Sequence, residues 1–133
     1  YTMPDTLSLH DALPIFSLYD LAKTSYMRDV FGDKDWKHIG IVVANINADF
    51  LAPVFFSDDL VIHTSVIHLG HKSFTLLQRA VNKASGVLKC QCRTIMVGYD
   101  VASKEPVELP ADFKRAICYY EGKTLEELSQ PLK

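Results

Sequence analysis

The chain has 133 residues, of which 48% are hydrophobic and 23% are charged. This length gives one domain with a single core, and this composition excludes an intrinsically disordered protein. The formal net charge is −2 and no segment concentrates lysine and arginine, which argues against a nucleic-acid partner. The longest apolar stretches fall far short of the ~20 residues of a membrane span, and no basic segment precedes one, so we expect neither a membrane helix nor a signal peptide.

The chain contains three cysteines, Cys90, Cys92 and Cys118. An odd number without regular spacing does not form a disulfide framework, and two cysteines one residue apart with no nearby pair of histidines make a poor zinc site. We interpret all three as small buried apolar side chains in a reducing compartment. The sequence therefore predicts a cytoplasmic protein with no metal and no cofactor.

The first fifteen residues look foreign to the rest of the chain. Residues Thr6–Ile15 read TLSLHDALPI, which is one reading-frame translation of a common short-read sequencing adapter, ACT CTT TCC CTA CAC GAC GCT CTT CCG ATC. The flanking adapter also accounts for Tyr1 and Thr2. We therefore interpret Tyr1–Ile15 as an adapter translation fused to a gene fragment, which belongs to neither the fold nor the function. The expected domain is residues 16–121, followed by a C-terminal tail, 122–133.

The first native element predicted is a helix over Phe16–Phe31. Its apolar residues recur at spacings of three and four, and charged residues occupy the rest of the helical wheel. Gly32 follows the last apolar pair, where a C-cap glycine belongs. From Gly40 onward the hydrophobic period changes to two, which predicts strands.

Four strands are predicted, over Ile41–Phe50, Leu60–Leu69, Ser73–Val81 and Val87–Tyr99. A helix followed by four strands with short connections predicts an α+β domain in which an antiparallel meander wraps the helix. His63 and His68 are predicted on opposite faces of their strand, in structural roles.

The C-terminal part is predicted as a loop flanked by Pro106 and Pro110, then a short helix from Ala111 to about Tyr120. A capping-box pattern over Thr124–Glu127 opens a last helical turn.

Three stretches of sequence together resemble a known family. FSLYDLAKT (16–24) looks like the start of a central helix, and DFLAPV (49–54), followed by Asp58 and Asp59, looks like a first long strand with its proline loop. GHKSFT (70–75) and RTIMV (93–97) complete the meander. In this order and spacing, Phe16 to Ile117 resembles the 4-hydroxybenzoyl-CoA thioesterase family of hotdog proteins. The resemblance implies a hotdog fold, an antiparallel sheet wrapped around a central helix, with its first strand replaced here by foreign sequence.

The resemblance also implies where catalysis occurs. In the family, the first strand carries an Asp, and a Gly-His-Val-Asn-Asn-like loop then opens the helix. The Asp acts on the thioester carbonyl as nucleophile or as general base for water, and backbone N–H groups at the helix start polarise the carbonyl oxygen. By count this Asp falls near position 5, where Asp5 stands by coincidence, without the loop; His10 and Asp11 also lie inside the adapter match. The catalytic residue is therefore unknown, and we expect the chain as written to be inactive.

The candidate coenzyme A site is the turn between the second and third strands: Gly70, His71, Lys72 and Ser73. In the family, basic residues at this turn lie near the phosphates of coenzyme A, and a glycine permits close backbone approach. The alternative is a solvated β-turn. Arg79 and Arg93 either assist in binding the phosphates of coenzyme A or face solvent.

Two further groups of residues allow two interpretations each. Asn45, Asn47 and Asp49 share one face of the first strand, where they would orient water or substrate, or form hydrogen bonds across a subunit interface. Phe55 and Phe56 in the proline loop would line an acyl pocket or pack against a partner subunit.

The predicted function is hydrolysis of a cytoplasmic acyl-CoA thioester. The protein is predicted to be a homodimer or tetramer, because one helix and four strands leave apolar surface uncovered. The alternative is a non-catalytic acyl-CoA-binding hotdog module. A dehydratase on the same fold is a weaker option, because no Asp/His pair appears in the strands. The native sequence upstream of Phe16 would discriminate between these hypotheses.

Overall fold

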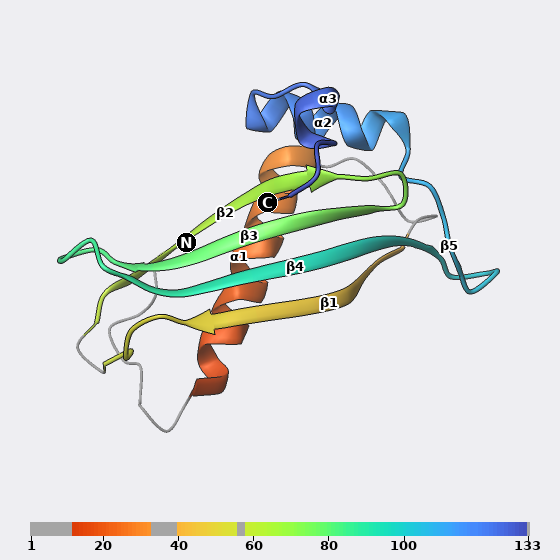
Figure 1. Cartoon of the computed structure of the whole chain (residues 1–133). Helices are drawn as coiled ribbons and strands as arrows, with labels where there is room; N and C mark the ends of the chain where they lie inside the picture. The colour runs from red at the N-terminus through yellow and green to blue at the C-terminus, as the bar shows by residue number, and fades with distance from the viewer. Residues whose placement is uncertain (1–11, 33–39, 56–57, 133) are drawn as a thin grey trace.

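The computed structural model describes residues 12–32, 40–55 and 58–132 of the chain. It is an α+β fold in which an antiparallel sheet wraps a long helix, as predicted (Figure 1). The elements in chain order are α1 Ala12–Phe31, β1 Gly40–Phe50, β2 Leu60–Leu69, β3 Ser73–Asn82, β4 Leu88–Asp100, β5 Glu105–Pro106, α2 Ala111–Glu121 and α3 Leu125–Leu128. No helix within the described ranges is both long enough and apolar enough to cross a membrane.

The sheet has the order β1-β4-β3-β2, and every pair of neighbours is antiparallel. The last three long strands form the predicted meander, joined by short turns. The expectation that β1 continues this meander is wrong, because β1 pairs with β4 at the opposite edge from β2. The connection over residues 51–59 is long enough to cross the end of the sheet, whereas the other two connections have hairpin length. The short strand β5, which pairs with β4, was not predicted.

A bulge in β2 changes which residues share a face. The register shifts between Val66 and His68, so that His63 pairs with Arg79 and His68 with Thr75. Arg79 and Thr75 lie on the same face of β3, because they are four residues apart on a strand of period two. The prediction that the two histidines lie on opposite faces is therefore wrong, because Ile67 is an extra residue in the ladder.

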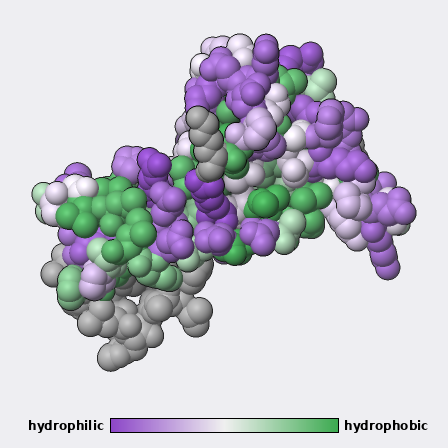
Figure 2. Space-filling model, in the orientation of Figure 1, coloured by the Kyte–Doolittle hydropathy of each residue, from purple (hydrophilic) through white to green (hydrophobic). Residues whose placement is uncertain are grey.

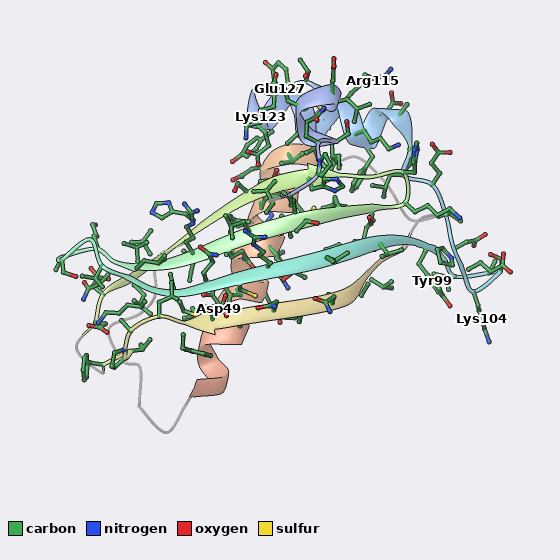
Figure 3. All side chains as sticks on the ribbon, viewed as in Figure 1. Asp49, Tyr99, Lys104, Arg115, Lys123 and Glu127 are labelled. Carbon is green, nitrogen blue, oxygen red and sulfur yellow. The ribbon has the colours of Figure 1, made fainter. Side chains whose placement is uncertain are left out.

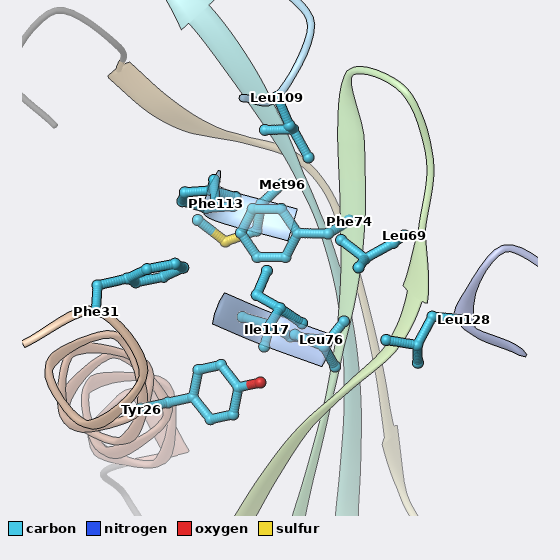
Figure 4. Packing of buried hydrophobic residues seen from close by; sticks show 11 residues of the cluster. Tyr26, Phe31, Leu69, Phe74, Leu76, Met96, Leu109, Phe113, Ile117 and Leu128 are labelled. Atoms are coloured by element: carbon cyan, nitrogen blue, oxygen red, sulfur yellow. The ribbon is translucent and has the colours of Figure 1, made fainter. Parts of the chain in front are cut away.

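The core lies between α1 and the inner face of the sheet, in two clusters. The first joins the N-terminal half of α1 to the end of the sheet where β2 begins; its members are Leu18, Tyr19, Ala22, Leu60, Ile62, Ala80, Cys90 and Cys92. The second joins the C-terminal half of α1 to the other end of the sheet and to α2 (Figure 4). There the ring of Phe31 stacks on that of Phe113 with centroids 4.4 Å apart.

Helix α1 begins at Ala12, four residues before the predicted Phe16. Pro14 lies in its first turn, a position that tolerates proline because the N–H groups there have no partner within the helix. The predicted end is confirmed: Gly32 has φ of 59° and its N–H donates to Arg28 O at 2.8 Å.

The C-terminal helices agree with the prediction. Gly122 terminates α2 with φ of 66°. Thr124 Oγ1 accepts a hydrogen bond from Glu127 N at 3.1 Å, and Glu127 Oε1 accepts one from Thr124 N at 3.3 Å, which completes the capping box of α3. Both helices lie together beside β2, an edge strand of the sheet, where α1 also ends (Figure 1).

Candidate functional site

The start of α1 lies at the end of the sheet where β1 ends and β2 begins. Leu18 and Tyr19 of α1 pack there with Leu60 of β2, and Ala48 of β1 and Val54 of the connection pack against the same cluster. A helix start presents unpaired N–H donors and a partial positive charge. The thioester carbonyl is predicted at this end of the molecule by the family resemblance alone.

The early start of α1 changes which donors are unpaired. In a helix that begins at Ala12, the amides of Phe16, Ser17 and Leu18 lie inside the helix, where each N–H donates to the carbonyl four residues before it. The unpaired donors are those of the first turn, and Pro14 contributes none. Asp5, His10 and Asp11 lie outside the described residues.

The predicted coenzyme A turn is held firmly by backbone hydrogen bonds. Gly70 N donates to Ser73 O at 2.7 Å, Leu109 N to His71 O at 2.8 Å, and Gly98 N to Lys72 O at 2.9 Å. The side chains of His71 and Lys72 are exposed. A Cβ on Gly70 would lie 3.2 Å from Ser73 Oγ, so the glycine provides room within the turn.

The turn lies at the opposite end of the sheet from the start of α1. The turn connects the end of β2, at Leu69, to the start of β3. Leu69 and Phe74, which pair across the two strands, belong to the core cluster that contains Phe31, the last residue of α1. A surface pocket of about 410 Å³ adjoins the turn; its lining is His68, Leu69, Gly70, His71, Lys114, Leu125 and Ser129. Within one chain, the structure therefore does not bring the turn and the helix start together.

The outer face of the sheet carries the remaining predicted polar residues. On β1, Asn45, Asn47 and Asp49 pair with alternate residues of β4, so they share one face as predicted. All three are exposed, and Asp49 lies towards the end where β1 finishes (Figure 3). Arg79 and Arg93 are also exposed on this face, and Arg79 Nε donates to Gln91 Oε1 at 3.3 Å.

A groove of about 460 Å³ runs between α1 and the inner face of β1. Asp20, Lys23 and Thr24 line its end nearer the start of α1. The rest of the lining is apolar and comes from four elements: Met27 and Phe31, Ile41 and Val43, Met96, and Phe113. The sequence prediction did not include this groove, although the α1 residues recur at spacings of three and four and so share one stripe of the helix.

Strand β1 is an edge strand with exposed apolar side chains. Ile46 and Phe50 of its inner face are 50% and 54% exposed, and Leu51, which follows the strand, is 58% exposed. Figure 2 shows hydrophobic surface over the end of the sheet where β1 finishes. A long, unpaired strand with apolar side chains is the kind of edge that pairs with another chain.

The three cysteines are free thiols: Cys90 and Cys92 are buried, and Cys118 is half-buried. Burial raises the pKa of the Cys90 thiol, which keeps it protonated and unreactive. Among the described residues, no three His, Cys, Asp or Glu side chains lie close enough together to hold a metal ion.

Solved structures with the same fold include thioesterases. One is a 1,4-dihydroxy-2-naphthoyl-CoA thioesterase from Synechocystis, with TM-score 0.75 and 16% identity, covering 91% of this chain and 96% of its own. A 4-hydroxybenzoyl CoA thioesterase variant complexed with 4-hydroxybenzoyl CoA has TM-score 0.72 and 20% identity, covering 88% and 97%. A Thermus thermophilus thioesterase complexed with coenzyme A and Zn has TM-score 0.71 and 22% identity, covering 86% and 83%.

A comparison with curated protein sequences finds no match. A family model does match: that of the Thioesterase-like superfamily, over residues 15–117. The match spans well over half of the chain and includes α1 from residue 15 onward, all four long strands and most of α2. With the hotdog arrangement of helix and sheet, it shows that this chain belongs to the Thioesterase-like superfamily.

Proposed function

We propose that the natural protein hydrolyses an acyl-CoA thioester in the cytoplasm, releasing the free acid and coenzyme A. The observation that carries this proposal is a largely apolar groove that follows α1 from Asp20 to Phe31, in a chain that belongs to the Thioesterase-like superfamily. Similar structures support the substrate class: two are named as thioesterases of aromatic acyl-CoA compounds, and one is complexed with coenzyme A.

The proposed reaction needs an attacking group and a site for the developing negative charge. A carboxylate from the native first strand would attack the thioester carbonyl or activate water, and the N–H groups at the native helix start would stabilise the oxyanion. Water supplies the hydroxyl of the acid product, and its remaining proton goes to the coenzyme A thiolate.

The groove fits the acyl group of such a substrate. It follows α1 from Asp20 to Phe31, which is about 16 Å along a helix. With the carbonyl at the helix start, an acyl chain or aromatic ring would extend past the Lys23–Asp20 ion pair, whose atoms are 3.2 Å apart, and reach the apolar lining. Apolar contact with Met27 and Met96 would bind it without specific polar contacts.

We also propose that two copies pair through β1. Antiparallel pairing about a twofold axis would cover the exposed side chains of Ile46 and Phe50. It would also place the second copy's turn over 70–73 at the same end as the start of α1. Ser73 of the second copy, which begins its β3, would lie three strand spacings from β1 of the first copy, or about 15 Å. Coenzyme A bound there, with Lys72 facing its phosphates, would then span the two copies.

The chain as written is proposed to be inactive, and its behaviour is better described as that of a non-catalytic acyl-CoA-binding hotdog module. The specific observation is that α1 starts at Ala12, so the N–H groups of Phe16, Ser17 and Leu18 donate to carbonyls within the helix. They are then not free to stabilise an oxyanion. The groove and the turn remain, so binding would persist when hydrolysis is lost.

The test is release of free thiol from a panel of acyl-CoA compounds. We compare the 133-residue chain with the protein that carries its native sequence upstream of Phe16, and include Asp5→Asn as a control. Hydrolysis by the native protein alone is expected, because the carboxylate and the helix start act as a unit. Comparable turnover by the 133-residue chain, abolished by Asp5→Asn, would refute the proposed inactivity. No turnover by the native protein would refute the proposed hydrolase.

A further inference from the structure

A buried ion pair lies beneath the segment that connects β1 to β2. Lys89 Nζ of β4 is 3.4 Å from Asp58 Oδ2, and the two side chains are only 10% and 7% exposed. Removing two charges from water is costly, and an apolar pair of the same volume is often as stable. Stability alone therefore does not explain why a buried ion pair lies here. Its effect is on the backbone groups that its two side chains hold in place.

The pair fixes two points of the connecting backbone. Lys89 Nζ donates to Pro53 O at 2.9 Å, and Phe55 N donates to Asp58 Oδ2 at 2.7 Å. Asp58 N in turn donates to Phe55 O at 3.0 Å, which closes the turn. The other carboxylate oxygen, Asp58 Oδ1, accepts a hydrogen bond from Asn82 Nδ2 at 2.9 Å. The connection is thereby tied to both β3 and β4.

Between these fixed points, Val54 packs against the core cluster that contains Leu18 and Tyr19. The backbone of residue 53 is held by Lys89 and that of residue 55 by Asp58, so Val54 has little freedom to move. The ring of Phe55 covers Lys89, with Nζ 5.1 Å from its centroid, and shields the pair from water. The ion pair is in this way linked, through one apolar side chain, to the core cluster in which the N-terminal half of α1 packs on the sheet.

We propose that Lys89 and Asp58 are positioning residues: they hold Val54 against the core cluster that Leu18 and Tyr19 of α1 share with the sheet, and so fix the N-terminal half of α1 relative to that sheet. The inference rests on the proposed hydrolase function, in which oxyanion donors at the helix start must keep their place. It assigns Lys89 and Asp58 a role through Val54, without contact with substrate.

The first measurement uses the 133-residue chain and amide hydrogen exchange by NMR. In Lys89→Met, Asp58 loses its counter-charge and Pro53 O loses its donor. The turn that Asp58 closes should then open more often, so the amides of Phe55 and Asp58 should exchange about tenfold faster or more. The amide of Leu51 should change little, because it donates to Lys89 O, a backbone atom. Lys83→Met in the exposed β3–β4 turn is the matched control. If Lys89→Met does not fold, the double variant Lys89→Met/Asp58→Asn leaves no unpaired charge and takes its place.

The second measurement is steady-state kinetics with the native upstream sequence present, at a temperature where every variant is fully folded. Misplacement of a helix start should lower kcat by about tenfold, less than the ~100-fold that a full 1 Å error can cost, with KM nearly unchanged. A purely structural pair would leave both constants as in the Lys83→Met control.

Faster exchange together with the lower kcat would support the inference. Unchanged exchange at Phe55 and Asp58, or faster exchange with unchanged kcat, would overturn it while the wild-type enzyme remained active. A wild-type protein without hydrolase activity would overturn the proposed function, and this inference with it.

Discussion

The hydroxyl of Tyr26 on α1 donates a hydrogen bond to Glu121 Oε1, the last residue of α2, at 2.7 Å. The same oxygen accepts the backbone N–H of Val66 on β2 at 2.8 Å. Tyr26 also meets the ring of Tyr120 edge-on, with centroids 5.2 Å apart. One carboxylate thus joins three elements that are far apart in the sequence, at the end of the sheet opposite the helix start.

Glu121→Ala is expected to lower the free energy of unfolding by about 2–3 kcal/mol, because it leaves the Tyr26 hydroxyl and the Val66 N–H without their acceptor. Tyr26→Phe removes one donor and should cost about 1–2 kcal/mol. Urea denaturation of the single and double variants gives the coupling energy. Glu105→Ala, an exposed carboxylate in β5, is the control and should change stability by less than about 0.5 kcal/mol. A Glu121→Ala variant as stable as this control would contradict the account of the three-way junction.

Stability should fall in alkaline solution because of buried tyrosines. Burial raises the pKa of Tyr26 well above its ordinary 10.0, and the hydrogen bond to Glu121 adds to this. Burial, followed by a hydrogen bond with Cys90, does the same for Tyr19. Above pH 10 the unfolded chain loses these protons and the folded chain keeps them, so folding binds more protons and stability falls as pH rises.

This stabilisation is fully present below pH 10 and should be lost above it at roughly 1.4 kcal/mol per pH unit for each tyrosine. Urea denaturation of wild type and Tyr26→Phe between about pH 9 and 11 tests this. The variant should show a shallower decline. Equal slopes would mean that Tyr26 ionises as readily in the folded state as in the unfolded chain.

Pairing through β1 predicts that Ile46→Lys gives a monomer. The substitution puts a charge on an edge strand at a position that is 50% exposed in the single chain and covered in the proposed dimer. Sedimentation velocity of wild type should show a dimer or tetramer. Leu125→Lys on α3, at a residue 47% exposed, adds the same charge elsewhere and should leave the assembly unchanged. A wild-type monomer would exclude the proposed assembly.

The groove between α1 and β1 predicts a size limit for the acyl group. Met27→Trp adds volume to the groove lining, so it should raise KM for a bulky acyl-CoA by about tenfold and leave a short one almost unaffected. Leu21→Trp, at an α1 residue 50% exposed and outside the groove lining, is the control. Equal effects on short and bulky substrates would place the acyl group elsewhere.

Much of the fold could be predicted because hydrophobic period is a local property. The bounds of Leu60–Leu69 were predicted to the residue, and β3 and β4 to within one residue at each end. The position of β1 beside β4 was not predicted, because the pairing partners of a strand depend on how the connection over residues 51–59 crosses the sheet. The bulge at Ile67 was also missed, since one extra residue leaves no mark on composition.

The site was predicted less completely than the fold. Residues on one turn, such as Gly70 and Lys72, are neighbours in the sequence and could be identified together. The groove takes side chains from α1, β1, β4 and α2, so it exists only after folding. The same holds for Lys89 and Asp58, which are far apart in the sequence and meet because Leu51 and Ala52 both hydrogen-bond to Lys89 O and bring the connection back to β4.

If coenzyme A binds at the turn over 70–73, Lys72→Ala should weaken binding of free coenzyme A by up to about fivefold at low salt, the upper range for one exposed ionic contact. The backbone of the turn would be unchanged, because its hydrogen bonds come from main-chain atoms. The loss should shrink as salt is added, since the contact is exposed and screened. Isothermal titration calorimetry of the 133-residue chain measures this without requiring hydrolysis. Lys83→Ala removes an equally exposed lysine from the β3–β4 turn at the other end of the sheet, and should leave affinity within error of wild type. The same small loss in both variants would mean that only net charge matters and that the turn is an ordinary solvated one.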